Sequence, residues 1–227
     1  ALEGPGGAGL VVLSRFPIER AEFHRFSAQG RCIKFWEGDC LSGKGVLAVQ
    51  IRVGEDLLWV GNPHPIACYA RYDASETACD QHDPNGDVRW SQLVEARRFM
   101  EGLAGDSPAL FGGDFNLTRS SRYYPGMTSR LAPLDRPGGP RSGLSTHASR
   151  GWTEIREEEI MTERIDYIWT RPGSRVRWQA RAPARLIFTE PVKLTSGESV
   201  PISDHPIVAV PFCLAPVTRE AARSECP

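Results

Sequence analysis

The sequence has little net charge and no long apolar run. Its 27 basic and 28 acidic side chains give a formal net charge of −1, so the chain as a whole has no electrostatic drive toward nucleic acid or an acidic membrane. No apolar stretch approaches the ~20 residues that a membrane-spanning helix needs. Residues Ala1–Gly4 lack the basic segment and apolar core that begin a signal peptide. These absences disfavour a non-specific nuclease and a transmembrane protein.

Cysteine is present, but without the spacing of a zinc site. The six cysteines include no CxxC pair, which argues against structural zinc. An even number permits disulfides in an exported protein, and Cys32–Cys40 and Cys68–Cys79 are the pairings closest in sequence. Buried free thiols are the alternative. The compartment therefore stays open, with secretion slightly favoured over the cytoplasm.

Length and apolar content fit one layered domain. The 227 residues are 41% hydrophobic and 24% charged, which is ordinary for a globular protein with a two-layer core. Apolar runs bounded by turns alternate with an amphipathic segment, without an internal repeat. We therefore expect an α/β (α+β) fold, a β-sandwich with flanking helices, in a single domain over residues 1–227. The pattern predicts a helix over 88–103 and strands over 9–14, 45–53, 57–60, 109–111, 165–169, 176–178, 186–188 and 207–212.

Two segments place polar side chains beside apolar strands. In the segment GGDFN, a glycine turn precedes Asp114 and Asn116, which project to the same side of an extended chain. In the segment SDHP, Asp204 is an oxygen ligand for a hard cation, and His205 exchanges protons near neutral pH. Solvated turn residues are the alternative for both segments. Together the two segments indicate a metal-assisted phosphoryl hydrolase.

Further polar residues lie at other predicted strand ends. Asp166 interrupts an apolar strand, where a carboxylate needs a partner. An imidazole would be the useful partner, because the carboxylate fixes its tautomer, and a salt bridge with Arg164 is the alternative. His64 could contact a phosphoryl oxygen, or it is an ordinary surface histidine. Asp39 and Lys44 flank a glycine turn that does not match a Walker loop, with a charged hairpin tip as the alternative.

These segments, in this order, resemble the endonuclease/exonuclease/phosphatase superfamily, whose members are similar in fold to pancreatic deoxyribonuclease. The resemblance covers most of the chain through the motifs GLVVLSRFPI, GNPHPIACY, GGDFN, RIDYIW and SDHPIVAV. Within the superfamily the chain is most similar to neutral sphingomyelinases. The supporting residues are LSRFPI at 13–18, Asp39 with SGKG at 42–45, and His64 five residues before Tyr69. The predicted helix after the histidine-bearing strand, which carries Arg89 and Gln92, also fits.

The resemblance implies a four-layer β-sandwich and a set of site roles. His205 would be the general base, oriented by Asp166, and His64 would contact the phosphoryl group. Asp114 and Asn116 would position the phosphate and stabilise charge. The resemblance further implies a Mg²⁺ or Mn²⁺ site with Asp204, Asp114 and Asn116, and substrate binding by Asp39, Lys44 and Tyr69.

The sequence differs from the family pattern in two places. The family has two further strands before LSRFPI, the second with a glutamate that holds magnesium, and residues 1–10 match neither strand. We therefore expect either a fragment of a longer protein or a degenerate homologue. Pro63 and Pro65 stand where the family usually has threonine and leucine beside its histidine, so we expect a tilt of His64.

The resemblance implies attack of water on the phosphodiester of a phospholipid at a membrane surface. Sphingomyelin would give ceramide and phosphocholine. A nuclease is one alternative, in which arginines of the long loop follow phosphates, and a non-catalytic relic that binds lipid or a partner is another. The oligomeric state stays open. The arginines in question are Arg119, Arg122, Arg130, Arg136, Arg141 and Arg150.

Overall fold

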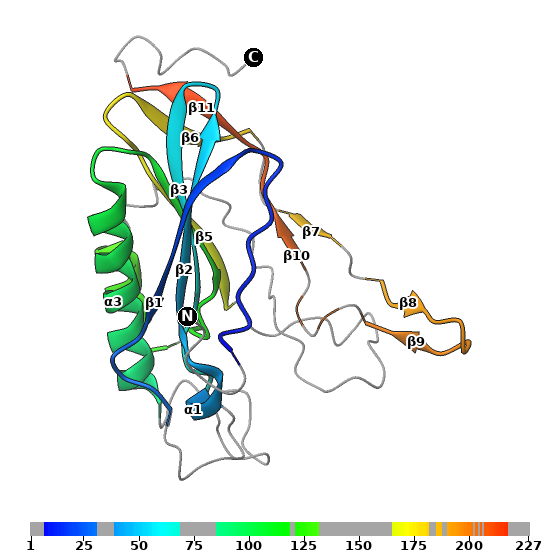
Figure 1. Cartoon of the computed structure of the whole chain (residues 1–227). Coiled ribbons are helices and arrows are strands. Elements are labelled where there is room, and N and C mark those ends of the chain that lie inside the picture. Colours follow the sequence, from blue (N-terminus) through cyan, green and yellow to red (C-terminus); the bar gives the residue numbers. More distant parts are fainter. Residues whose placement is uncertain are drawn as a thin grey trace.

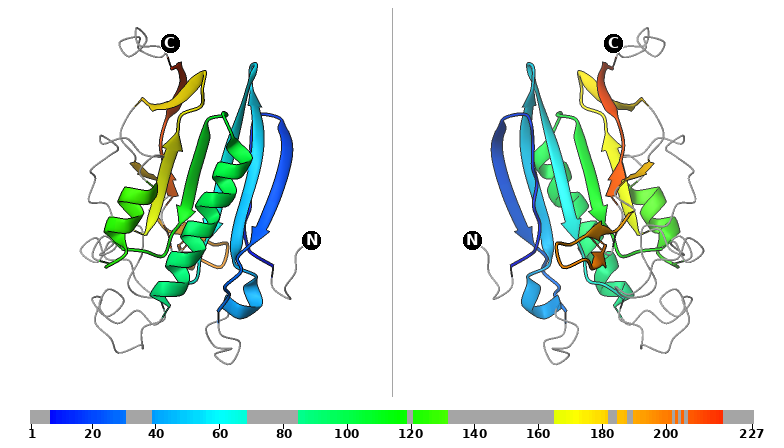
Figure 2. Two further views of the ribbon diagram at one scale, coloured as in Figure 1. Left: turned by 90° about the vertical axis from the view of Figure 1, so that its left-hand side faces the viewer. Right: turned by 90° about the vertical axis from the view of Figure 1, so that its right-hand side faces the viewer.

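The computed structural model of the chain describes residues 7–30, 39–68, 85–118, 121–131, 165–181, 185–187, 190–201, 203, 205 and 207–217. Two of the predicted site residues, Tyr69 and Asp204, lie outside these ranges. Within them, a five-stranded sheet has helices on one face and paired strands on the other, as Figures 1 and 2 show.

The central sheet consists of β1 (Ile18–Arg25), β2 (Gly45–Val53), β3 (Asp56–His64), β4 (Ala109–Asp114) and β5 (Asp166–Arg171), in that spatial order. β2 and β3 form an antiparallel hairpin, whose turn contains Gly54 at a φ of 60°, a conformation that glycine adopts without strain. β3 and β4 are parallel, because the helix α3 (Gly86–Ala104) returns the chain between them. β1 with β2 and β4 with β5 are antiparallel.

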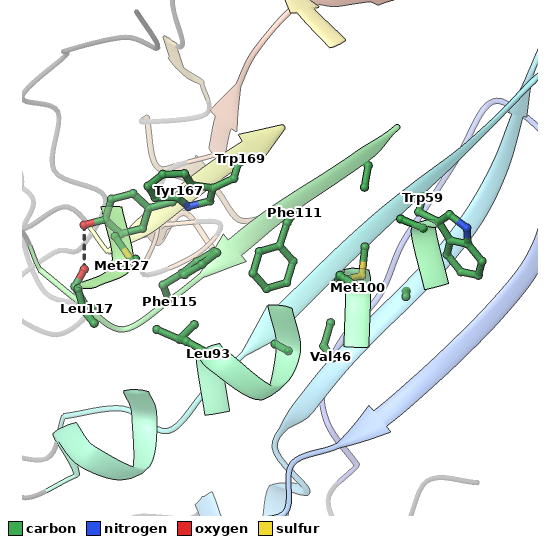
Figure 3. Packing of buried hydrophobic residues seen from close by; sticks show 14 of the residues in the cluster. Val46, Trp59, Leu93, Met100, Phe111, Phe115, Leu117, Met127, Tyr167 and Trp169 are labelled. Carbon is green, nitrogen blue, oxygen red and sulfur yellow. Dashed lines mark hydrogen bonds between the residues drawn. The ribbon is translucent and has the colours of Figure 1, made fainter. Parts of the chain in front are cut away.

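α3 covers one face of the sheet and builds the larger core. Its buried residues Leu93, Ala96 and Met100 recur at helical spacing. They pack with Phe111 of β4 in one apolar cluster, which Figure 3 shows in detail. The helix ends at Gly105, which has a φ of 52° and donates its backbone N–H to the last turn. Helix and sheet are therefore joined by a continuous apolar contact.

The other face of the sheet packs against a second layer of strands. β6 (Val176–Ala180) pairs antiparallel with β11 (Phe212–Pro216). Trp178 of β6 packs against the buried side chains Val49 and Leu58 of the central sheet. The smaller elements are the antiparallel pair β7 (Arg185–Ile187) and β10 (Ile207–Ala209), the hairpin β8 (Val192–Lys193) and β9 (Ser199–Val200), and the helices α1 (Asp39–Ser42) and α4 (Tyr124–Leu131).

The predicted α/β fold class is confirmed, and so are the helix over 88–103 and the hairpin built on 45–53. The described residues supply the helix layer, the central sheet and the second strand layer. The strand predicted over 207–212 is instead two strands, β10 and β11. β1 escaped prediction because it is an edge strand with a mostly exposed, charged sequence, so it lacks a clear apolar alternation.

The strand predicted over 9–14 is wrong, because these residues form no regular element. Val11 is 67% exposed and Leu13 is 92% exposed, so the apolar run is not a buried strand. Gly9 has a φ of 67°, outside the extended region that a strand requires.

Two remaining expectations concern cysteines and membrane spans. Cys68 and Cys213 each form a disulfide bond, so the alternative of buried free thiols is wrong for these two residues. Among the described residues, no helix is long and apolar enough to cross a bilayer.

Replacing Leu93 by alanine tests the contact between α3 and the sheet. Leu93 is fully buried, and Leu93→Ala should lower the free energy of unfolding by about 2–5 kcal/mol, since it removes apolar contacts and leaves a cavity. Arg98 is exposed on the same helix, so Arg98→Ala should change the free energy of unfolding by less than about 0.5 kcal/mol. Urea unfolding measures both values. Equal losses in the two variants would contradict this packing.

Candidate active site

One edge of the central sheet gathers most of the predicted site residues. His64 ends β3 and Asp114 ends the parallel strand β4, so both reach the same edge. Asp166 begins the antiparallel strand β5 and is paired directly with Asp114. Lys44 immediately precedes β2, whose first residue is paired with His64. Asp39 lies in α1, at the same end of the sheet (Figure 1).

His205 and Asp166 form a short hydrogen bond across 39 positions of sequence. The Nδ1 atom of His205 lies 2.8 Å from Oδ2 of Asp166. A carboxylate oxygen only accepts, so Nδ1 carries a hydrogen, and in the neutral imidazole the lone pair is then on Nε2. Nε2 lies 4.0 Å from Oδ2 of Asp114. The backbone N–H of His205 donates to Oγ of Ser203 at 3.1 Å, which helps to hold the turn.

Asp114 and Asn116 are held by hydrogen bonds within the turn after β4 and to the segment after β3. The Asn116 N–H donates to Oδ1 of Asp114 at 2.7 Å, and its side-chain Nδ2 donates to the carbonyl of Pro65 at 3.3 Å. Asn116 has a φ of 50°, in the left-handed region that asparagine tolerates better than most residues. A Cβ at Gly113 would lie 2.8 Å from the carbonyl oxygen of Pro63, so only glycine permits this close approach of the strands.

Asp39, Lys44 and His64 form a buried chain of polar contacts. Nζ of Lys44 lies 3.0 Å from Oδ1 of Asp39 and 3.0 Å from Nε2 of His64. An ammonium group only donates, so Nε2 of His64 accepts, and the imidazole is neutral with its hydrogen on Nδ1. The Lys44 and Asp39 side chains are 5% and 4% exposed. The alternative of a solvated hairpin tip is therefore wrong.

The site shifts two titrating groups toward their neutral forms. Burial, together with the charge of Lys44, lowers the pKa of His64 from 6.5 to about 4. Burial raises the pKa of Asp114 from 3.8 to about 6, and the charge of Asp166 contributes to the rise. Both shifts have the same main cause, because burial disfavours the charged form of each group.

These two shifts act on stability in opposite directions. The unfolded chain protonates His64 near pH 6.5 and the folded chain near pH 4, so a fall in pH through this window favours unfolding. The folded chain protonates Asp114 near pH 6 and the unfolded chain near pH 3.8, so a rise in pH through that window favours unfolding.

The predicted site residues that the structure describes lie together. His205, Asp166, Asp114 and His64 are joined by distances of 4.0 Å or less between neighbours. The contacts of Asn116 link it to Asp114. Tyr69 and Asp204 fall outside the described residues. The catalytic and binding roles of all these residues stay predictions.

The metal prediction has no complete ligand set in the described part of the chain. There, no group of three or more His, Cys, Asp or Glu side chains is arranged to hold a metal ion. Asp114 and Asn116 are present as oxygen donors at the end of β4, while the third predicted ligand, Asp204, is not described.

Three buried polar residues lie beside the site, namely Asn85, Arg89 and Gln92. The sequence indicates Arg89 and Gln92 only as support for the family resemblance and assigns none of the three a role in the site. Their side chains contact the backbone of residues 66 and 67, just after His64. Their spacing puts them on one face of α3. Polar residues on a helix face that continues as an apolar stripe were the signal that could have revealed them.

Comparison with known proteins decides the family. The chain matches the sequence model described as the Endonuclease/Exonuclease/phosphatase family over residues 2–205. The chain belongs to this family. The match includes every residue of the predicted site, from Asp39 to His205. The predicted resemblance is thereby confirmed.

Two curated relatives of this family member are named for sphingolipid enzymes. A putative neutral sphingomyelinase of Drosophila melanogaster is 30% identical over 208 residues, which are 90% of this chain and 44% of that protein. The inositol phosphosphingolipids phospholipase C of Saccharomyces cerevisiae is 27% identical over 129 residues, which are 57% of this chain and 26% of that protein. The chain thus spans less than half the length of these relatives.

Solved structures share the fold at low identity. Sphingomyelinase C from Streptomyces griseocarneus has a TM-score of 0.61 at 20% identity, covering 92% of this chain and 70% of that one. A mutant beta toxin from Staphylococcus aureus with bound magnesium ions has a TM-score of 0.55 at 18% identity, covering 87% and 65%. These similarities support the α/β architecture of the family.

The neutral state of His64 is testable by NMR. Its ring carbon shifts should titrate with a midpoint near pH 4, the value to which burial and Lys44 lower its pKa. Replacing the ion pair in the double variant Asp39→Asn/Lys44→Met should raise the midpoint, because the lowering effect of Lys44 exceeds the raising effect of Asp39. A midpoint near 6.5 in the folded wild type would contradict the buried contact with Lys44.

Proposed function

We propose that this protein hydrolyses the phosphodiester of a sphingomyelin-type lipid, with ceramide and phosphocholine as products. The observation that carries the proposal is the hydrogen bond between His205 and Asp166 beside Asp114. In the neutral imidazole this bond places the lone pair on Nε2, at the acidic edge of the sheet, which is what a general base requires. The names of the two relatives refer to sphingomyelin and to phosphosphingolipids, and they support this substrate class.

In the proposed step, Nε2 of His205 accepts a proton from a water molecule. The water oxygen forms a bond to phosphorus while the bond from phosphorus to the ceramide oxygen breaks in line. Asp166 stabilises the imidazolium ion that results, because its carboxylate already accepts the Nδ1 hydrogen at 2.8 Å. The departing ceramide oxygen takes up a proton from solvent, and His205 later releases its own.

His64 has a different proposed task, because it is neutral and its Nε2 atom is occupied by Lys44. Its remaining ring hydrogen, on Nδ1, is available to donate to a phosphoryl oxygen. Lys44 holds the imidazole, and Asp39 in turn compensates the charge of Lys44 at 3.0 Å. In this proposal Asp39 and Lys44 support substrate binding through His64.

The donors present fit a hard divalent ion that keeps much of its water. Oδ2 of Asp114 lies 3.9 Å from His64 Nε2 and 4.0 Å from His205 Nε2, too far for a hydrogen bond with either. The lone pairs of this oxygen can therefore bind a metal ion. Mg²⁺ typically takes only one or two carboxylates and keeps several waters. We propose Asp114 and Asn116 as ligands, with Asp204 as a third. A bound ion would neutralise charge on the phosphoryl oxygens.

Replacing His205 tests the general base. His205→Ala should lower kcat for phosphocholine release from sphingomyelin in mixed micelles by about 10²–10⁴-fold. His24 is the matched control, because it forms a comparable pair with Glu95 of α3 at 2.7 Å and has no role in the proposed step. His24→Ala should leave kcat nearly unchanged.

Three outcomes would contradict the proposal. Equal phosphocholine release by wild type and His205→Ala would exclude the role of His205. Salt-sensitive DNA cleavage without lipid hydrolysis would favour a nuclease. A folded protein that binds sphingomyelin vesicles but hydrolyses no phosphodiester would favour a non-catalytic relic.

The proposed metal site predicts a change in ion requirement. A chelator should abolish phosphocholine release, and Mg²⁺ or Mn²⁺ should restore it. Asp114→Asn should need at least about tenfold more Mg²⁺ for half-maximal rate, because it loses an anionic oxygen ligand. Asp106 is exposed outside the site, so Asp106→Asn should match the wild type. Identical Mg²⁺ titrations of all three proteins would argue against Asp114 as a ligand.

A further inference from the structure

We infer that Gln92, assisted by Arg89, is a positioning residue of this site, because the two side chains fix the peptide groups of Ile66 and so hold His64 and Asn116 in place. The inference deepens the proposed function and rests on it for its kinetic readout. A second readout, on the structure itself, does not depend on activity.

Both polar backbone groups of Ile66 are bound by side chains of α3. Oε1 of Gln92 accepts the N–H of Ile66 at 2.7 Å, and Nε of Arg89 donates to its carbonyl at 2.7 Å. Nε2 of Gln92 also donates to the carbonyl of Ala28 at 2.9 Å. Gln92 is 0% and Arg89 is 2% exposed, so these contacts are made where water does not compete. The backbone at Ile66 is therefore fixed on both sides.

The residues next to Ile66 lead directly to the site. The carbonyl of Pro65 accepts the side-chain amide of Asn116 at 3.3 Å. The N–H of Ala67 donates to Oδ2 of Asp39 at 3.2 Å. His64 immediately precedes this short segment and ends β3. A shift of the segment would therefore move His64, Asn116 and Asp39 together.

The buried polar side chains of α3 are confined to the end of the helix that lies beside the site. Asn85, Arg89 and Gln92 follow one another at spacings of four and three on one helix face, and Asn85 donates to the carbonyl of Ala67 at 3.2 Å. Beyond them the same helix buries Leu93 and other apolar residues against the sheet. Burying polar side chains costs free energy unless they are hydrogen-bonded. Apolar residues would fill the same space, so the polar pattern points to positioning of the backbone.

Two substitutions of Gln92 separate positioning from packing. Gln92→Met has a similar length but removes both hydrogen bonds. Gln92→Glu keeps an oxygen acceptor for the Ile66 N–H. The matched control is Glu95→Ala on the same helix, since Glu95 accepts from the N–H of Ser27 at 3.0 Å, a contact that does not involve the segment after His64.

The readout independent of activity is NMR on the folded proteins. In the wild type and in Glu95→Ala, the Ile66 amide should exchange slowly with solvent, and His64 should carry its hydrogen on Nδ1 at pH 7. In Gln92→Met, the Ile66 amide should exchange faster by about tenfold or more, and His64 should lose the single tautomer that the contact with Lys44 selects. Gln92→Glu should stay close to the wild type in both measurements.

The kinetic readout uses sphingomyelin in mixed micelles with Mg²⁺. Gln92→Met should lower kcat by about a hundredfold while KM changes by less than about threefold, since a small misplacement of catalytic groups affects the transition state most. In Gln92→Glu, kcat should recover most of this loss. Glu95→Ala should retain kcat even if its unfolding temperature falls as much as that of Gln92→Met.

The outcomes separate this inference from the proposed function. If Gln92→Met folds with a protected Ile66 amide and a single His64 tautomer, the inference is overturned. If Gln92→Met does not fold, Gln92→Glu decides: a tautomer and amide exchange like the wild type support the inference, and their loss despite the retained acceptor overturns it. If the wild type releases no phosphocholine, the proposed function fails, while the NMR comparison still decides the role of Gln92.

Discussion

Two carboxylates face each other on neighbouring strands, and the site is built around that repulsive arrangement. The register of β4 against β5 pairs Asp114 directly with Asp166, and like charges at facing positions destabilise a sheet. His205 compensates Asp166 through a 2.8 Å hydrogen bond, and the N–H of Asn116 serves Asp114 at 2.7 Å. A slip of β5 by one residue against β4 would turn Asp166 to the other face, away from Asp114. The proposed proton transfer and ion binding at this edge therefore depend on the register.

Aromatic packing beneath the site maintains this register. Phe115 and Tyr167 meet edge to face at a centroid distance of 5.6 Å, and both are buried. The hydroxyl of Tyr167 donates to the carbonyl of Leu117 at 2.8 Å, as Figure 3 shows. The backbone N–H of Phe115 donates to the carbonyl of Ile165. The strand that carries Asp166 is thus bonded to the loop that follows Asn116, on the side away from the reacting groups.

The site has a rigid polar support on the side of α3 and α1. Lys44 is buried with its charge compensated by Asp39, and it fixes the tautomer of His64. Gln92 and Arg89 bind the backbone just beyond His64. Removing one partner from such a buried set leaves an unpaired polar group, at a cost of about 1–3 kcal/mol or more for a charge. This cost holds the neutral imidazole of His64 in place beside Lys44.

Local pattern was enough for the longest helix and the central hairpin, and it pointed to most of the site residues. Helical apolar periodicity predicts α3, and a largely apolar run followed by a turn predicts β2 and the β2–β3 hairpin. The edge strand β1 has no such pattern. The apolar run over 9–14 is mostly exposed, with Leu13 92% exposed, although Val12 packs against the smaller core cluster. An acid within an apolar strand pointed to a histidine partner for Asp166, which His205 provides. The roles carried by these residues stay proposals.

The sequence by itself determined which residue types stand at the ends of which strands, since periodicity and turn residues are local properties of the chain. The tertiary structure alone decided their partners. That His64 is neutral, that Lys44 and Asp39 are buried, and that Gln92 binds the backbone after His64 follow from contacts between distant segments. Desolvation and hydrogen-bond geometry exist only after those segments have packed. Composition and spacing do not contain this information.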